Sequence, residues 1–196
     1  MYDQKKLEIE FSAWDKHLKD QSLPTWEELP DLELYMDQVL ILINRYNNIF
    51  NTMGKAPAVT PPMINNYVKQ KTIPAPVNKK YSRLHMAYLI MVCTLKQALN
   101  IATIEKLIPF GLPEEEVRMI YNSFVKNQKK AFSYVAEQVT HVAVPILSKE
   151  NIDAERVQDL VLQVAITANI FKTLSDNISD LSPAVQTADA EEKSSK

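Results

Sequence analysis

Acidic residues are missing from a long central part of the chain. No aspartate or glutamate lies between residues 38 and 104, a segment of 67 residues that holds eight basic side chains. The rest of the chain carries 14 basic and 24 acidic residues, so the small overall charge of −2 hides two parts of opposite sign. A field of one sign attracts a polyanion and speeds its association. The central segment is therefore a candidate surface for nucleic acid; a basic face that meets only solvent is the alternative.

Glycine and cysteine are also scarce. The only glycines are Gly54 and Gly111, which disfavours open α/β folds and β-sandwiches, because their turns need many glycines. The single cysteine, Cys93, excludes a disulfide framework and a thiolate metal cluster. There is no glycine-rich phosphate loop, and the three histidines have no metal-binding spacing. Nothing at the residue level supports an enzyme, so we expect a non-catalytic protein without a cofactor.

Long apolar runs are absent as well. The most apolar stretch, residues 84–92, is too short to span a bilayer. Residues 1–20 are charged throughout and do not have the pattern of a secretion signal. We expect no membrane partner and a reducing, cytoplasmic setting.

Apolar side chains recur at spacings of three and four, which predicts an all-α fold. Asp31, Thr60 and Ser82 are expected to cap the helices that follow them, and Pro145 to kink or end a long helix. The helix from Arg83 is apolar on most sides and is expected to be the central buried one. Helices are predicted over residues 5–19, 31–50, 61–71, 83–99, 103–108, 113–149 and 153–178.

Residues 60–108 follow a distinctive order: a helix that carries Ile64 and Tyr67, an Ile73-Pro74 step, a basic strand-like segment over 77–81, and a helix capped by Ser82. This order resembles the core of MerR-type helix-turn-helix regulators, in which a recognition helix with an aromatic residue precedes a Leu/Ile-Pro step and a basic wing. Residues 29–39 and 63–69 also resemble an uncharacterised Firmicute family described only as a domain of unknown function.

The residues of this segment suggest how it would read a duplex. Asn65 and Asn66 lie early on the helix, and asparagine can bond adenine N6 and N7 together, discriminating by about 1–3 kcal/mol. Lysine and arginine suit phosphate contacts, which position a protein without reading sequence. The alternative is that the asparagines form a solvated face and that the ring of Tyr67 belongs to the core. The predicted nucleic-acid-binding residues are Thr60, Asn65, Asn66, Tyr67, Lys69, Lys71, Lys79, Lys80, Tyr81 and Arg83.

The chain is expected to divide into a helix-turn-helix domain with N-terminal helices over residues 1–110, a helical hairpin over 111–181 and a disordered tail over 182–196. The short link between the two long C-terminal helices makes an antiparallel hairpin the expected arrangement. Two helices bury little alone, so the hairpin is expected to form a homodimer, or to close a monomeric bundle with the Trp14 helix. No effector is identified by the sequence.

These observations predict a DNA-binding transcription regulator with double-stranded DNA as its partner. The alternative is a non-catalytic interaction protein that keeps the helix-turn-helix fold and binds another protein. The acidic remainder of the chain, and Asn66 where the resemblance leads us to expect arginine, favour that alternative.

Overall fold

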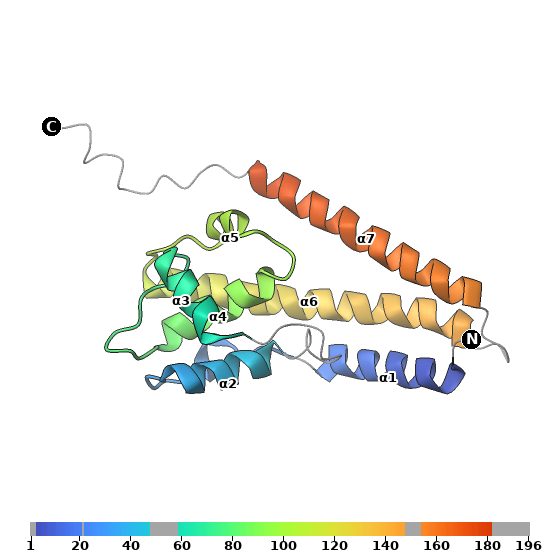
Figure 1. The fold of residues 1–196 in the computed structure, drawn as a ribbon, viewed down its shortest axis with the longest axis horizontal. Helices are drawn as coiled ribbons and strands as arrows, with labels where there is room; N and C mark the ends of the chain where they lie inside the picture. Colours follow the sequence, from blue (N-terminus) through green and yellow to red (C-terminus); the bar gives the residue numbers. More distant parts are fainter. Residues whose placement is uncertain (1–2, 21, 48–58, 148–153, 182–196) are drawn as a thin grey trace.

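The computed structural model describes residues 3–20, 22–47, 59–147 and 154–181. The regular elements of the described residues are helices, which confirms the predicted all-α class, and the β structure among these residues consists of two isolated bridges (Figure 1). A 3₁₀ turn, η1 (Trp26–Glu28), accompanies the α-helices. These are α1 (Gln4–Asp20), α2 (Met36–Tyr46), α3 (Pro61–Lys69), α4 (Arg83–Leu95), α5 (Ile101–Leu107), α6 (Glu114–Leu147) and α7 (Ala154–Asp180).

Helix α4 lies at the centre of the fold. Every residue from His85 to Cys93 is buried, which confirms the prediction of a central buried helix. Ser82 occupies its N-cap position as expected, but the helix ends at Leu95 and not at Leu99. The main hydrophobic cluster surrounds α4 and takes in side chains from α2, α3, α5 and the first turns of α6.

The segment before α2 is fastened to α6 by polar contacts. The Trp26 backbone N–H donates to Asn122 Oδ1 over 3.0 Å, and the Tyr121 hydroxyl donates to the Pro24 carbonyl over 2.8 Å. The Trp26 and Tyr121 rings meet edge to face with centroids 6.3 Å apart. Val117 and Tyr121 of α6 therefore belong to the same hydrophobic core as α2, α3, α4 and α5. The predicted domain boundary after residue 110 stays a prediction.

Helix α2 begins later than predicted. Asp31 does not cap it; the helix starts at Met36, with Tyr35 at the N-cap. The reason is a backbone pairing far along the chain: Leu34 and Tyr81 exchange two hydrogen bonds of 2.9 and 2.8 Å, which hold residue 34 extended. Residues 48–50, the predicted end of this helix, lie outside the described residues.

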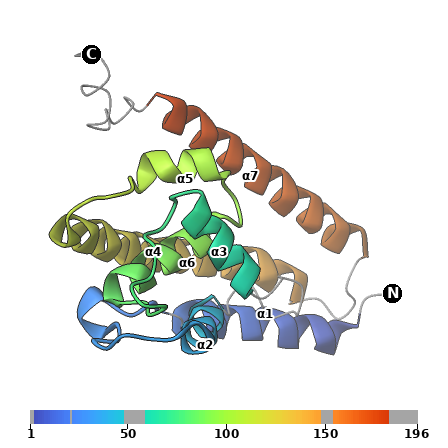
Figure 2. The ribbon, with the colours of Figure 1, turned by 60° about the vertical axis from the view of Figure 1, so that its left-hand side comes forward.

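Helix α7 and the second half of α6 lie outside the main hydrophobic core. Helix α1 runs beside the second half of α6, where Leu18 packs with Ala136 and Phe132 (Figure 1). Helix α7 runs back in the opposite direction and diverges from α6, as Figures 1 and 2 both show. Pro145 lies inside α6, close to its end at Leu147. Residue 153 and the predicted disordered tail lie outside the described residues.

Candidate nucleic-acid interface

Helix α3 has one buried face and one exposed face. Ile64 and Tyr67 are buried against the core, whereas Asn65, Asn66 and Lys69 are exposed. Pro61 starts the helix as expected, and Thr60 is its N-cap, but the Thr60 side chain makes no capping hydrogen bond, so that part of the prediction is wrong. The helix therefore presents two amides and one amine to solvent.

The C-terminal end of α3 is closed by a Schellman turn. The Thr72 N–H donates to the Tyr67 carbonyl over 2.9 Å, and the Lys71 N–H donates to the Val68 carbonyl over 3.1 Å. Lys71 has a φ of 58°, the left-handed conformation that this motif usually reserves for glycine. The Thr72 hydroxyl also donates to Glu105 Oε1 over 2.9 Å, which joins this turn to α5. The turn holds the Lys71 side chain exposed at the end of α3.

The predicted basic wing is a tight hairpin turn. Val77 and Lys80 exchange hydrogen bonds of 3.1 and 2.9 Å across Asn78 and Lys79, whose φ angles are 50° and 64°. Two consecutive left-handed residues define a type I′ turn, which fits the twist of a two-residue hairpin. Asparagine tolerates this conformation, whereas lysine adopts it at a cost of about 1–2 kcal/mol. Lys79 is exposed at the tip of this turn.

The connector before the hairpin is anchored by His85. Its Nδ1 accepts the Ser82 backbone N–H over 3.0 Å, so Nε2, which lies 3.1 Å from the Ala75 carbonyl, donates to that oxygen. The Tyr81 ring meets the His85 ring edge to face, with centroids 5.6 Å apart. The hairpin is thereby held to the N-terminal end of α4, close to residues 31–35.

Two of the predicted phosphate-binding residues are already paired with carboxylates. Lys80 Nζ lies 3.1 Å from Glu33 Oε2, and Arg83 lies 3.2 Å from Asp31 Oδ1. The hydrogen bond and the charge of Glu33 raise the pKa of Lys80 above its usual value. The sequence reasoning missed these pairs because they depend on the Leu34–Tyr81 bridge. Within the described parts of the chain, Lys69, Lys71 and Lys79 have no carboxylate partner.

Two predicted contact residues belong to the core instead. Tyr67 is 5% exposed and Tyr81 is 2% exposed, so neither ring is available at the surface. Burial raises the pKa of both hydroxyls. Tyr67 is buried because it lies on the same face of α3 as Ile64. Tyr81 is buried because its backbone pairs with that of Leu34. Both rings therefore pack in the core, and a part for these two residues in nucleic-acid binding stays a prediction.

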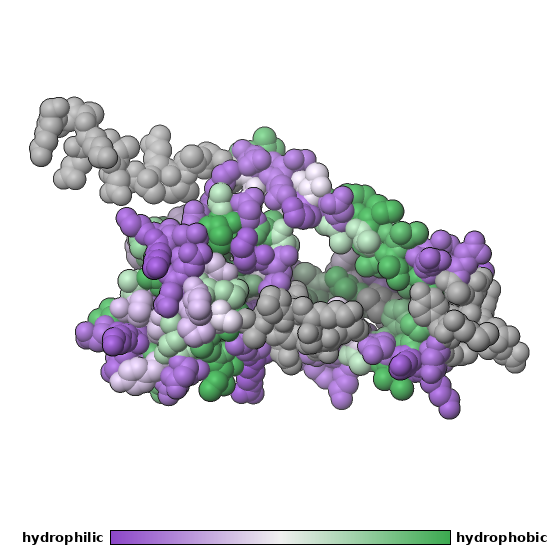
Figure 3. All heavy atoms as spheres, viewed as in Figure 1, coloured by the Kyte–Doolittle hydropathy of each residue, from purple (hydrophilic) through white to green (hydrophobic). Residues whose placement is uncertain are grey.

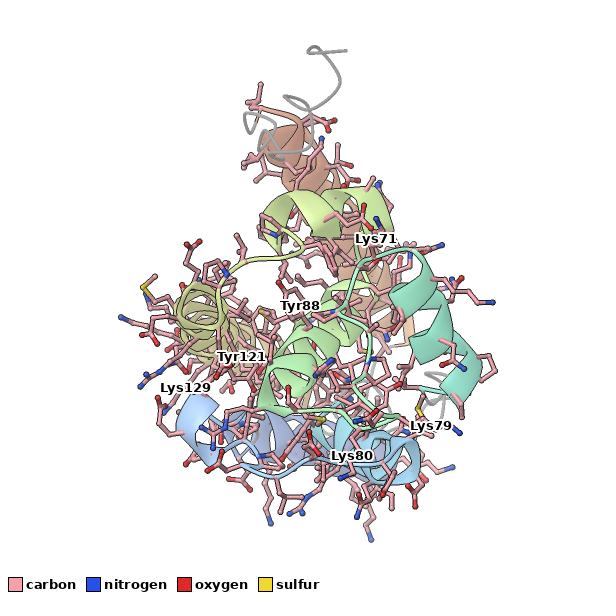
Figure 4. All side chains as sticks on the ribbon, turned by 90° about the vertical axis from the view of Figure 1, so that its left-hand side faces the viewer. Lys71, Lys79, Lys80, Tyr88, Tyr121 and Lys129 are labelled. Carbon is pink, nitrogen blue, oxygen red and sulfur yellow. The ribbon has the colours of Figure 1, made fainter. Side chains whose placement is uncertain are left out.

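The remaining candidates share one side of the molecule. Helix α3 lies at one edge of the molecule in Figure 4. Lys71 lies toward one end of this helix and Lys79 toward the other. Lys129, on α6, lies on the opposite side in the same view. The exposed residues on this side (Thr60, Asn65, Asn66, Lys69, Lys71 and Lys79) are called the α3 face below.

Three observations bear on other kinds of site in the described part of the chain. Cys93 is buried in α4, and burial raises the pKa of its thiol to about 12, so it remains protonated at neutral pH. No group of His, Cys, Asp or Glu among the described residues is arranged to hold a metal ion. None of the described helices combines the length and apolar character needed to cross a bilayer.

Comparison with known proteins matches the chain to a protein family. The model of a family described as "Domain of unknown function (DUF1836)" matches residues 24–124. This range begins at the segment fastened to α6, includes α2 to α5 and ends in α6, so it coincides with the main hydrophobic core. No curated protein and no solved structure matches the chain.

Proposed function

The chain belongs to the DUF1836 family, and we propose that it is a cytoplasmic DNA-binding transcription regulator whose α3 face meets the duplex. The observation that carries this proposal is a set of three exposed lysines, Lys69, Lys71 and Lys79, that lack carboxylate partners in the described chain. Lys69 lies in α3, Lys71 in the turn that closes this helix, and Lys79 at the tip of the hairpin over residues 77–80. Such amines suit phosphate contacts on either side of a helix that enters a groove.

The order of elements supports a helix-turn-helix of the MerR type. Helix α3 is followed by the Ile73-Pro74 step, a two-residue basic hairpin and the Tyr81-Ser82 pair that starts α4. Helix α2 is joined to the start of α3 by Asn44, whose Oδ1 accepts the Val59 N–H over 2.8 Å and whose Nδ2 donates to the Val59 carbonyl over 3.2 Å. This clamp fixes where α3 begins relative to α2.

Backbone strain points to the same face. Lys71 and Lys79 both adopt left-handed conformations in which glycine or asparagine would be more stable. Strained residues concentrate at functional sites, where the side chain has a use that offsets the strain. A lysine at each of the two positions is accounted for if its amine binds a phosphate.

The experiment is a salt titration of binding to a random-sequence duplex. The test variant combines Lys69→Gln, Lys71→Asn and Lys79→Asn, since asparagine tolerates the left-handed backbone. The slope of log K against log[salt] should become shallower by about 2.7 units, because each lost phosphate contact removes about 0.9. The matched control is Lys126→Gln, Lys129→Gln and Lys130→Gln, which removes the same charge from exposed positions on α6. Equal slopes for the two triple variants would contradict the proposal.

A specific observation favours the second candidate, a protein-interaction module. Val77 on the hairpin is 63% exposed and Tyr35 is 54% exposed. Lys80 Nζ lies 5.9 Å from the centre of the Tyr35 ring. The exposed side chains of Val77 and Tyr35, and the paired amine of Lys80, therefore lie beside the α3 face. Exposed aromatic and aliphatic side chains of this kind suit a protein partner. Absence of duplex binding by the wild-type chain even at low salt would favour this candidate.

A further inference from the structure

A groove separates α6 from α7 in the C-terminal part of the molecule. It has a volume of about 370 Å³, and α1 contributes Phe11 to its wall. Tyr134 and Val135 of α6 face Val164 and Phe171 of α7 across it. In Figure 3 the molecule is hollowed beneath α7, and apolar side chains gather near the start of that helix. Helices α6 and α7 therefore do not bury their facing apolar side chains against each other.

Helix α7 carries a heptad repeat whose members Leu160, Val164, Thr167 and Phe171 line the groove. Apolar residues stand at positions 157, 160, 164, 171, 174 and 178, with Thr167 at the one polar step, so the spacings alternate between three and four. We call this set the α7 seam. Its members Val164, Phe171, Leu174 and Ile178 are 50–58% exposed. A strict heptad with apolar a and d positions is the pattern by which one helix packs along another in a coiled coil.

We propose that a second copy of this chain occupies the groove, pairing its own α7 seam with the seam and with the apolar wall of α6. The inference deepens the proposed function, because two joined copies would present two α3 faces to one duplex. The helices that would join the copies lie outside the segment that matches the family model, except for the first turns of α6.

Charge favours a second copy over a charged partner. The positions that flank the seam from 161 to 177 are Val161, Gln163, Ala168, Ile170, Ser175 and Asn177, none of which is charged. Two copies can therefore approach without like-charge repulsion at these positions, which set partner choice in coiled coils. The chain's own tail is a poor occupant, since residues 182–196 contain one valine and no larger aliphatic or aromatic side chain.

The α7 seam is also long enough for a coiled coil. Helix α7 has 27 residues, which corresponds to a length of about 40 Å. The seam spans residues 157–178 and so covers about three heptads, the length from which an apolar a and d pattern indicates a coiled coil.

Sedimentation equilibrium of the full-length chain without DNA tests the inference directly. The wild-type protein should have twice the chain mass of 22.4 kDa at concentrations of about 1–100 µM. Val164→Glu should weaken the dimer by at least about tenfold, because a charge enters the seam. Ile166→Glu is the matched control: Ile166 is 59% exposed against 58% for Val164, but it lies off the seam on the same helix. The control should remain dimeric.

A second pair of variants separates dimer loss from unfolding of α7. Val164→Ala and Ile166→Ala both raise helix propensity, so α7 should keep its helical circular dichroism in each. Only Val164→Ala should shift the equilibrium toward monomer. A monomeric wild-type chain over the whole concentration range, or equal effects at positions 164 and 166, would overturn the inference. A dimer that ignores duplex DNA would instead overturn the proposed function and leave this inference standing, and a monomer that binds duplex would do the reverse.

Discussion

At the scale of single residues, lysines stand where the backbone favours other side chains. Lys71 closes α3 in the left-handed conformation, and Lys79 adopts it at the tip of the hairpin turn. Each position combines a local cost with an exposed amine. The two properties can be separated by substitution, because glycine relieves the strain and removes the charge, whereas alanine removes only the charge.

Lys71→Gly should therefore raise the free energy of unfolding by about 1 kcal/mol, while Lys71→Ala should leave it nearly unchanged. Both variants should lose the same duplex affinity and about 0.9 units of salt slope, since each loses one phosphate contact. Chemical denaturation and a salt titration measure the two effects independently. If the glycine variant kept wild-type duplex affinity, the Lys71 amine would have no part in binding.

Breaking the ion pair between Lys80 and Glu33 should strengthen duplex binding, whereas the substitutions of Lys71 should weaken it. Glu33 raises the pKa of Lys80 through a hydrogen bond and its charge. Glu33→Gln removes the competing carboxylate, so Lys80 becomes available to a phosphate and the nearby field becomes more positive. Duplex affinity should rise by about threefold or more, and the salt slope should steepen by up to about 0.9 units. An unchanged or lower affinity, measured by fluorescence anisotropy, would show that the hairpin does not meet the duplex.

The exposure of only some of the predicted nucleic-acid-binding residues could be derived from the sequence. Asn65, Asn66 and Lys69 follow from the period of a short helix, so their exposure was predictable from residues 60–71 alone. The burial of Tyr81 and the pairing of Lys80 and Arg83 depend on residues 31–34, which lie about fifty positions earlier in the chain. Periodicity carries no information on such long-range pairing.

At the scale of elements, α4 organises the fold. Its nine consecutive buried residues touch the helices on every side, so a continuous apolar run was enough to predict its central place. Its end was less predictable: residues 96–100 contain no proline or glycine, and the chain leaves the helix without a strong sequence signal. The start of α2 was missed for a different reason, the tertiary pairing of Leu34.

Truncating a side chain of α4 should weaken the whole molecule. Ile90 is fully buried, so Ile90→Ala should lower the free energy of unfolding by about 2–5 kcal/mol through lost burial and a new cavity. The same truncation at the exposed Ile166 of α7 should change it by no more than about 0.5 kcal/mol. Urea denaturation followed by circular dichroism measures both. Similar losses at the two positions would contradict the central role of α4.

At the scale of the whole molecule, the α3 face and the α6–α7 groove lie in different parts of the structure. The α3 face belongs to the family segment 24–124, whose core α4 organises, whereas the groove lies between the far half of α6 and α7. The sequence shows that one segment is basic and that the rest of the chain is acidic. It did not predict that acidic side chains would pair with residues of the basic segment in the fold. Asp31 and Glu33 do so, and among the predicted binding residues they leave Lys69, Lys71 and Lys79 as the basic side chains without a carboxylate partner in the described chain.

Lysine footprinting tests the duplex-binding face most directly, because it reads every amine of the wild-type chain at once. The protein is acetylated with and without a random-sequence duplex at low salt, and each lysine is quantified by mass spectrometry. The account predicts that Lys69, Lys71 and Lys79 are protected severalfold by the duplex, while Lys126, Lys129 and Lys130 keep their reactivity. Protection confined to the α6 lysines, or unchanged reactivity at all six, would contradict it.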